Sequence, residues 1–246
     1  MTTLKNKVAI VTGSSKGIGA QIAILLAAAG AKTIINYAND DAAANDIVNQ
    51  IKSAGGEAIA VQADVSNTEQ VATLFETTIS EFGKPDILVN SAGMMINKPI
   101  AETTDEDFDR IFSINVKGTF NTLREAATKL NDGGRIVNLS STTTRMMLPT
   151  YGTYCATKGA VEQLTRVFSK EVGARNITVN AVSPGPTDTE LFNQGKTDEA
   201  VEKLASMSAF NRIGEPIDIA RIVSFLVSEE AAWVTGQNIG ANGGVA

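Results

Sequence analysis

The amino-acid sequence predicts an α/β protein: one doubly wound domain over residues 1–246, with helices on both faces of a parallel sheet. Three observations lead to this prediction. Short runs of β-branched residues alternate with longer amphipathic stretches, and glycine ends most of those stretches. No linker, low-complexity tract or tandem repeat divides the chain. Alternating strands and helices imply right-handed crossovers within one parallel sheet of about seven strands.

The first half of the chain alternates strictly between the two patterns. The run VAIVT at 8–12 is short, apolar and followed by glycine, as expected of a buried parallel strand. Gly30, Gly55 and Gly83 mark the ends of helical patterns. The further strands are expected at 32–36, 57–62 and 87–90, and the helices at 17–29, 40–53 and 68–82.

The second half begins with a long helical pattern at 104–130, which ends at the Asp-Gly-Gly sequence of 132–134. Pro184-Gly185-Pro186 then interrupts the alternation, and a polar segment follows to about Arg212. Too little chain follows this segment to fold as a second domain. The remaining strands are expected at 135–139, 177–182 and 237–239, and the remaining helices at 152–172 and 216–228.

Charge and composition narrow the function classes. The formal net charge is −6 and no basic run occurs, so we expect no nucleic-acid binding. No apolar run reaches the roughly 20 residues that span a bilayer, so we expect no membrane segment. The first residues carry no signal-peptide pattern, and a cytoplasmic location is therefore predicted.

The residue types that perform catalysis are restricted. The chain contains no histidine and a single cysteine, Cys155. Histidine-based triads, histidine metal sites and cysteine-cluster metal sites are thus excluded, and we expect no catalytic metal. A general acid or base must come from Tyr, Lys, Asp, Glu or Cys.

A glycine-rich turn separates the first expected strand from the first expected helix. Its sequence is Thr12-Gly-Ser-Ser-Lys-Gly-Ile-Gly19, with the spacing Gly-x3-Gly-x-Gly. Glycines let the backbone approach a pyrophosphate, and the helix N-terminus offers free N–H groups and a positive dipole end. A plain glycine turn is the alternative. The position at the first strand–helix junction favours a Rossmann-type dinucleotide site, and the spacing excludes a P-loop.

A tyrosine and a lysine lie four residues apart near the start of the helical pattern at 152–172. Tyr154 and Lys158 share one helix face, where an ammonium is expected to lower the pKa of a phenol from about 10. Ser141 follows the expected strand at 135–139, at the edge that borders the ligand crevice. Alone, the Tyr–Lys spacing describes many solvated helix faces, and Ser141 is equally typical of a polar turn.

Taken together, these motifs resemble the short-chain dehydrogenase/reductase family over essentially the whole chain, and especially NADPH-dependent 3-oxoacyl-carrier-protein reductases and ketone or carbonyl reductases. The resemblance implies that Tyr154 is the acid/base and that Lys158 tunes it and holds the nicotinamide ribose. Ser141 would orient the carbonyl, and Asn115 would support a water relay. By the same resemblance the cofactor-binding residues are Gly13, Ser15, Lys16, Gly17, Ile18, Gly19, Asn36, Tyr37, Ala38, Asp64, Val65, Asn90, Ala92, Gly93, Tyr154, Lys158, Pro184, Gly185, Thr187 and Thr189.

The cofactor preference depends on two positions. NAD enzymes of this family usually carry a carboxylate at the end of the second strand, whereas this chain has Asn36. Lys16 lies in the glycine turn, where relatives that use NADP often carry a basic residue. We therefore expect NADP(H), with NAD(H) as the alternative and with Lys16 as a surface charge in that case.

The expected substrate is a small carbonyl or alcohol compound with an apolar body, either a ketone or a 3-oxoacyl-type compound. Methionines adapt to irregular apolar ligands, although such residues are also ordinary core. Residues 187–212 would form a mobile lid. A homotetramer or homodimer is expected from the family. A non-catalytic NADP-sensing or scaffold protein and an epimerase or dehydratase are the rival functions. The predicted substrate-pocket residues are Met94, Met95, Met147, Tyr151 and Phe192.

Overall fold

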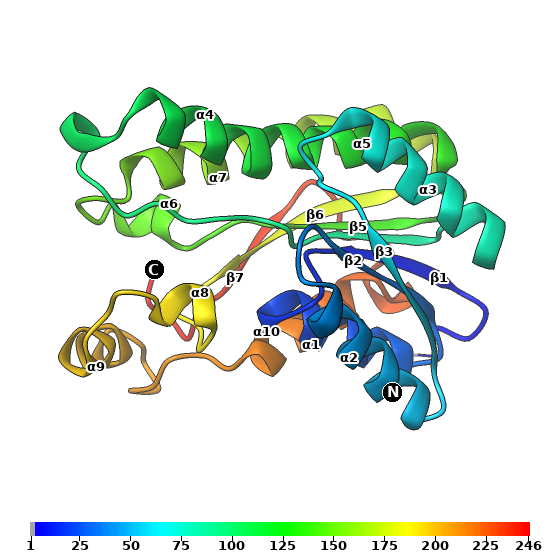
Figure 1. The fold of residues 1–246 in the computed structure, drawn as a ribbon, viewed down its shortest axis with the longest axis horizontal. Coiled ribbons are helices and arrows are strands. Elements are labelled where there is room, and N and C mark those ends of the chain that lie inside the picture. Colours follow the sequence, from blue (N-terminus) through cyan, green and yellow to red (C-terminus); the bar gives the residue numbers. More distant parts are fainter. Residues whose placement is uncertain (1–2) are drawn as a thin grey trace.

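The structure is a computed structural model that describes residues 3–246. Its centre is a parallel sheet of seven strands in the order β3-β2-β1-β4-β5-β6-β7 (Figure 1). The predicted fold class is therefore confirmed. The strands are β1 (Val8–Thr12), β2 (Lys32–Tyr37), β3 (Glu57–Gln62), β4 (Ile87–Asn90), β5 (Arg135–Leu139), β6 (Thr178–Pro184) and β7 (Asn238–Ala241).

Helices cover both faces of the sheet (Figure 1). One layer contains α1 (Gly17–Ala28), α2 (Asp41–Ser53) and α10 (Pro216–Leu226), and the opposite layer contains α3 (Thr68–Phe82), α4 (Asp105–Phe112), α5 (Gly118–Lys129) and α7 (Gly152–Glu171). Each layer buries its own apolar cluster against the sheet. Both faces of the central strands are therefore buried, which explains why β1 is almost entirely apolar and why every residue of β1 and β5 is buried.

The strand order reverses between β1 and β4, because β2 and β3 extend the sheet in one direction and β4 to β7 in the other. At such a switch point the connections leave the carboxyl ends of neighbouring strands toward opposite faces, and a crevice opens between them. The short helices α6 (Thr143–Met146), α8 (Glu190–Asn193) and α9 (Asp198–Ser206) all lie at this end of the molecule (Figure 1).

The structure differs from the sequence-based expectation in two segments. The expected helix at 104–130 is interrupted by a π-helical turn at Ser113–Lys117, between α4 and α5. The polar segment after β6 contains α8 and α9, which were not expected. Thr189 and Thr197 cap these helices by accepting hydrogen bonds from the backbone N–H groups of Phe192 and Ala200.

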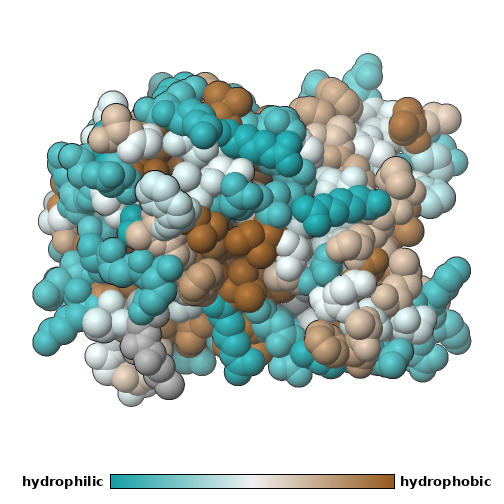
Figure 2. All heavy atoms as spheres, turned by 180° about the vertical axis from the view of Figure 1, so that it is seen from behind, coloured by the Kyte–Doolittle hydropathy of each residue, from teal (hydrophilic) through white to brown (hydrophobic). Residues whose placement is uncertain are grey.

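The surface carries exposed apolar side chains. Figure 2 shows an apolar patch near the middle of the face opposite to that of Figure 1, with hydrophilic residues around it. Contiguous apolar surface of this kind is typical of protein–protein contacts. In residues 3–246, no helix is long and apolar enough to cross a membrane. The large apolar residues that are exposed are Ile100, Phe108, Phe120, Met147, Val167, Leu191, Met207, Phe210, Phe225 and Trp233.

Candidate active site

A cavity of about 370 Å³ lies at the carboxyl ends of the strands. Its walls come from the glycine-rich turn, the segment after β4, the end of β5, the start of α7 and the segment that contains α8 and α9. The structure thus joins residues that are far apart in the sequence. The predicted site residues that line it are Gly13, Ser15, Lys16, Gly17, Ile18, Gly19, Ala92, Gly93, Met94, Met95, Ser141, Tyr151, Tyr154, Lys158, Pro184, Gly185, Thr187, Thr189 and Phe192.

The glycine-rich turn has the space and the backbone conformation that a dinucleotide requires. Gly13 and Gly17 have φ values of 61° and 60°, a region that favours glycine. A Cβ atom on Gly13 would lie 2.6 Å from the Cα of Ala92, and one on Gly19 would lie 2.5 Å from the carbonyl oxygen of Gly13. The first turn of α1 contains no acidic residue, so the helix itself places no negative charge beside its free N–H groups. These features fit a bound pyrophosphate.

Lys16 lies at the mouth of the cavity and is paired with a residue that the sequence analysis missed. Its Nζ is 2.9 Å from Oε2 of Glu190 on α8, and both side chains are largely exposed. The hydrogen bond and the charge of Glu190 raise the pKa of Lys16. The charge expected to bind a 2′-phosphate is therefore available on the surface, but it is shared with a carboxylate of the expected lid.

Asn36 does not present its side chain to the cavity, contrary to the expectation. The residue is 1% exposed, and its Nδ2 donates to the carbonyl oxygens of Ala63 at 3.0 Å and Val61 at 3.3 Å. Its Oδ1 accepts from the backbone N–H of Gly13 at 3.3 Å. The Asn36 amide thus links β3 and the residue after it to the glycine turn, because its side chain points toward these backbone groups.

Five further predicted cofactor residues lie near the same sheet edge but outside the cavity lining: Tyr37, Ala38, Asp64, Val65 and Asn90. Their polar groups are bound within the protein. The Tyr37 hydroxyl donates to Asp41, and the Asp64 carboxylate accepts from the N–H and hydroxyl of Ser66. The side chain of Asn90 is buried in a network with Asn138 and Thr122. Their contacts to a cofactor remain predictions.

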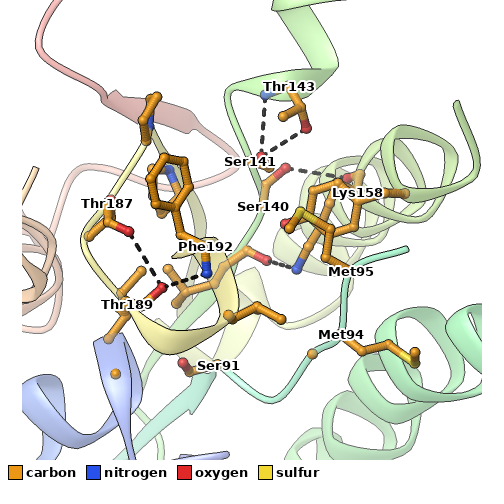
Figure 3. Close-up of a pocket in the computed structure, with 18 of the residues that line it drawn as sticks. Ser91, Met94, Met95, Ser140, Ser141, Thr143, Lys158, Thr187, Thr189 and Phe192 are labelled. Carbon is orange, nitrogen blue, oxygen red and sulfur yellow. Dashed lines mark hydrogen bonds between the residues drawn. The ribbon is translucent and has the colours of Figure 1, made fainter. Parts of the chain in front are cut away.

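The predicted catalytic trio converges in one wall of the cavity. Ser141 lies two residues after the end of β5, and Tyr154 and Lys158 lie on the first two turns of α7. The hydroxyl of Ser141 acts on the phenol of Tyr154 as a hydrogen-bonding neighbour that lowers its pKa. The Nζ of Lys158 donates to the carbonyl oxygen of Leu139 at 2.8 Å and lies 5.7 Å from the Tyr154 ring centroid. Figure 3 shows Ser141 bonded to Thr143, with Lys158 on the neighbouring helix.

The electrostatics of this wall differ from the expectation that Lys158 lowers the phenol pKa. Burial raises the pKa of Tyr154 to about 12, and the hydrogen bond with Ser141 offsets this only in part. Burial also lowers the pKa of Lys158 to about 8. Desolvation disfavours the charged form of both groups, and this effect exceeds the attraction expected from their spacing. The phenol is therefore protonated at neutral pH, as a proton donor must be.

Asn115 lies in the π-helical turn, a local distortion that often occurs at functional sites. Its Nδ2 donates to the carbonyl oxygen of Met94 and to Oγ1 of Thr157, and its Oδ1 accepts from the N–H of Met94. A Cβ atom on Gly93 would lie 3.3 Å from Oδ1 of Asn115 and 3.6 Å from Nζ of Lys158. Asn115 and Lys158 thus approach the same glycine from two sides, although Asn115 does not itself line the cavity.

The remaining walls are apolar. Of the five predicted substrate residues, Met94, Met95, Tyr151 and Phe192 line the cavity. Met147 does not: it is 83% exposed and lies in a left-handed backbone conformation with a φ of 52°. The sequence analysis missed Leu191 and Leu204, which lie on the unexpected helices α8 and α9. Within residues 3–246 the structure contains no cluster of three or more side chains that could hold a metal ion.

Comparisons with known proteins agree with this geometry. A family model described as "Enoyl-(Acyl carrier protein) reductase" matches residues 13–246. An NADPH-dependent aldehyde reductase-like protein of Arabidopsis thaliana is 46% identical over 255 residues, which cover 98% of this chain and 94% of the relative. A versicolorin reductase of Emericella nidulans is 41% identical over 253 residues, covering 98% and 96%. The crystal structure of an angucycline C-6 ketoreductase with bound NADP superposes with a TM-score of 0.94 at 41% identity, covering 99% and 97%.

Proposed function

The chain belongs to the short-chain dehydrogenase/reductase family, and we propose that this NADP(H)-binding oxidoreductase reduces the carbonyl group of a small, neutral, apolar ketone. The observation that carries the proposal is the convergence of Ser141, Tyr154 and Lys158 beside a cavity cradled by glycines. A hydroxyl, a protonated phenol and a buried amine in one wall are what acid-assisted reduction of a carbonyl needs.

Several lining residues would hold the cofactor. The amides of the glycine turn and of α1 would bind the pyrophosphate, Lys16 a 2′-phosphate, and Lys158 the nicotinamide ribose. Pro184, Gly185, Thr187 and Thr189 would lie along the nicotinamide. When bound, NADPH supplies the hydride that the protein itself lacks.

The side chains of the catalytic wall would donate the proton and stabilise the negative charge that develops on the carbonyl oxygen. Ser141 would donate a hydrogen bond to the carbonyl oxygen as negative charge grows there. Tyr154, whose raised pKa keeps it protonated, would donate its proton to that oxygen. Lys158 in its charged form would stabilise the phenolate that remains, and Asn115 would position a water that restores the proton. In the reverse direction Tyr154 would act as the base, which requires its deprotonated form.

The apolar walls favour the substrate class. Met94, Met95 and Leu191 give the cavity an apolar, adaptable lining, and the T-shaped pair of Tyr151 and Tyr154 adds flat aromatic surface at a centroid distance of 6.4 Å. The relatives named as versicolorin reductase and angucycline ketoreductase support a ketone with an extended apolar body. Residues 187–212 would form the lid over such a substrate.

Assembly and location are also proposed. The exposed apolar side chains of Phe120, Phe225 and Trp233 support association into a homodimer or homotetramer. The location stays the cytoplasmic one expected from the sequence, and neither nucleic acid nor membrane is proposed as a partner.

The test is a panel of ketones and hydroxy compounds assayed by NADPH and NADH oxidation or formation. We expect kcat/KM to be highest for neutral apolar ketones with NADPH. A ketone that carries a carboxylate should react more slowly, and an enoyl compound in the panel tests the activity named in the family description. Tight NADPH binding with no turnover of any compound would instead favour the non-catalytic sensor, and isomerisation without net NADPH oxidation would favour the epimerase.

A further inference from the structure

We infer that Glu162 is a positioning residue whose carboxylate holds the turn that presents Ser141 to Tyr154. The inference rests on the proposed function, because it gives Glu162 a role that acts through Ser141. Glu162 lies on α7, one turn beyond Lys158 and on the same side of the helix. It belongs to neither the glycine turn nor the cavity lining.

The contacts of Glu162 lie on both sides of Ser141 in the sequence. Oε1 of Glu162 accepts a hydrogen bond from the hydroxyl of Ser140 at 2.8 Å and from the hydroxyl of Thr144 at 2.9 Å. Thr144 is also 3.0 Å from the carbonyl oxygen of Ser141. One carboxylate oxygen therefore fastens the residue before Ser141 and the helix turn after it to α7.

The Ser141 turn is held to β6 by backbone hydrogen bonds from Ser140 to Val182 and from Thr142 to Pro184, whereas its attachment to α7 depends on side chains. The hydroxyl of Ser141 accepts hydrogen bonds from the N–H and the hydroxyl of Thr143, so its direction follows the shape of this turn. The helix that follows, α6, has only four residues and no side-chain cap at its N-terminus. Tyr154 is carried by a different element, so the distance between the two catalytic hydroxyls depends on how the turn is held against α7.

Three other contacts between α7 and this region act on one side of Ser141 only, and one of them is the hydrogen bond from the Ser140 hydroxyl to the carbonyl oxygen of Lys158 at 3.4 Å. Lys158 donates to the carbonyl oxygen of Leu139, before Ser141, and Cys155 donates to the carbonyl oxygen of Thr143, after it. The carboxylate of Glu162 accepts hydrogen bonds from residues on both sides of Ser141. Hydrogen bonds from hydroxyls to a carboxylate are stronger than those between neutral groups. Ser140 is buried, and if Glu162 were replaced by an apolar residue its hydroxyl would keep only the more distant carbonyl oxygen of Lys158, at 3.4 Å, as an acceptor.

The experiment compares Glu162→Leu, which keeps the approximate size but removes the acceptor, with Glu162→Gln, which keeps one acceptor oxygen. Displacement of a reacting group by about 1 Å costs up to about 100-fold, so we expect Glu162→Leu to lower kcat by about 10- to 100-fold. Glu162→Gln should retain kcat within about threefold. The dissociation constant of NADPH, measured by fluorescence titration, should change by less than about twofold in both variants. Glu171→Gln, on an exposed residue of the same helix, is the control.

A double-mutant cycle with Ser141→Ala distinguishes positioning from general destabilisation. If Glu162 acts through Ser141, Glu162→Leu should lower kcat by less than about twofold in the Ser141→Ala background. Thr144→Val removes one of the two donors with little change of shape and serves if Glu162→Leu fails to fold. It should lower kcat by about three- to tenfold, again only when Ser141 is present.

The outcomes separate the inference from the proposed function. If Ser141→Ala lowers kcat but Glu162→Leu and Thr144→Val leave it unchanged, the inference is wrong and the proposed function stands. If the losses from Glu162→Leu and Ser141→Ala multiply, Glu162 does not act through Ser141, and the inference is again wrong. If Ser141→Ala itself leaves kcat unchanged, the role of Ser141 in the proposed function is wrong.

Discussion

The two walls of the cavity are built in opposite ways. The catalytic wall, formed by the end of β5 and by α7, is part of the core: α7 alone buries seven residues, Thr153, Thr157, Lys158, Val161, Thr165, Phe168 and Ser169. The opposite wall, formed by α8 and α9, buries no residue of either helix. Regions with few buried contacts open at low free-energy cost, whereas core elements open only near global unfolding. We therefore propose that chemistry lies on the rigid wall and substrate fit on the adaptable one.

Buried hydrogen bonds explain the rigidity of the catalytic wall. Thr122 on α5 donates to Asn90 on β4, Asn90 donates to Asn138 on β5, and Asn138 donates to Thr165 on α7, all within 2.7–2.8 Å. This chain of bonds crosses two strands and ends on the helix that carries Tyr154. Because its groups are satisfied only in this arrangement, the network resists small displacements of α7.

The lid wall depends instead on exposed, local interactions. Lys16 and Glu190 form a surface ion pair, a type of contact worth about 0–1 kcal/mol. Lys196 lies over the ring of Phe192 at 4.5 Å, and both residues belong to the same short segment. Such contacts can break without disturbing the core, as the proposed lid requires.

The strongest test of the comparison is Lys158→Met, which should lower kcat and raise the free energy of unfolding. Losing the charge beside Tyr154 should lower kcat by at least about 100-fold and weaken NADPH binding. Below pH 8 the buried ammonium is charged, and a pKa lowered from 10.5 to about 8 corresponds to about 3 kcal/mol of destabilisation. Thermal unfolding at pH 7 should therefore give a higher Tm for the variant, even though Leu139 loses a hydrogen bond. A lower Tm would mean that Lys158 stabilises the folded protein rather than destabilising it.

A second test concerns Asn36. The sequence suggested that this residue determines cofactor preference, whereas in the structure its amide links β3 to the glycine turn. Asn36→Asp would place a carboxylate against the carbonyl oxygens of Val61 and Ala63, so we expect about 2–4 kcal/mol of lost stability. Asn39→Asp makes the same change at an exposed position of the same segment and should cost less than about 0.5 kcal/mol. Urea unfolding of both variants is the measurement. A stable Asn36→Asp protein that has turned to NADH would restore the sequence-based interpretation.

The pH dependence of reduction tests the roles of Tyr154 and Lys158. The pKa of Lys158 is about 8, so its charge is present below that pH and lost above it, while Tyr154 stays protonated up to about 12. The value of kcat/KM for NADPH reports groups of the free enzyme and should fall by about tenfold per pH unit above pH 8. The phosphates of bound NADPH favour the charged form of Lys158. At saturating NADPH the decline in rate should therefore begin at a higher pH. A profile that stays flat to pH 10 would remove Lys158 from the reaction.

The smallest expected effects come from the lid side. Lys16→Ala should weaken NADPH binding by about tenfold and leave NADH within about twofold, because only the 2′-phosphate needs that charge. Glu190→Gln should strengthen NADPH binding by about two- to threefold, because it frees Lys16 from its competitor. Lys52→Ala, on the exposed surface of α2, is the control. Equal losses of both cofactors in Lys16→Ala would assign this lysine to the pyrophosphate instead.

Sequence patterns were sufficient for the sheet and for most of the site, because both depend on order along the chain. The strands at 8–12, 57–62, 87–90 and 135–139 have the predicted bounds, since each has a short apolar centre and is followed by glycine or polar residues. The carboxyl ends of parallel strands meet at one edge, so motifs that follow strands were correctly expected near one another.

The errors concern the direction and environment of side chains, which spacing does not determine. Asn36 lies one residue before the end of β2, and its amide faces inward to three backbone groups. Met147 follows a strand and a short helix, but a left-handed backbone turns it outward. The pKa of Tyr154 depends on burial in the folded wall and not on its distance from Lys158 along the helix. The π-helical turn at Asn115 has no sequence periodicity of its own, so the segment read as one helix.

The central claim is that the rigid wall performs the chemistry through Tyr154, and the chain offers a matched control. Tyr151 lines the same cavity three residues away, so Tyr154→Phe and Tyr151→Phe remove the same hydroxyl from neighbouring rings. The measurement is the single-turnover rate of NADPH oxidation with a saturating apolar ketone. We expect Tyr154→Phe to lower this rate by about 10²- to 10⁴-fold and Tyr151→Phe to lower it by less than about threefold. Equal rates for the two variants would contradict the account.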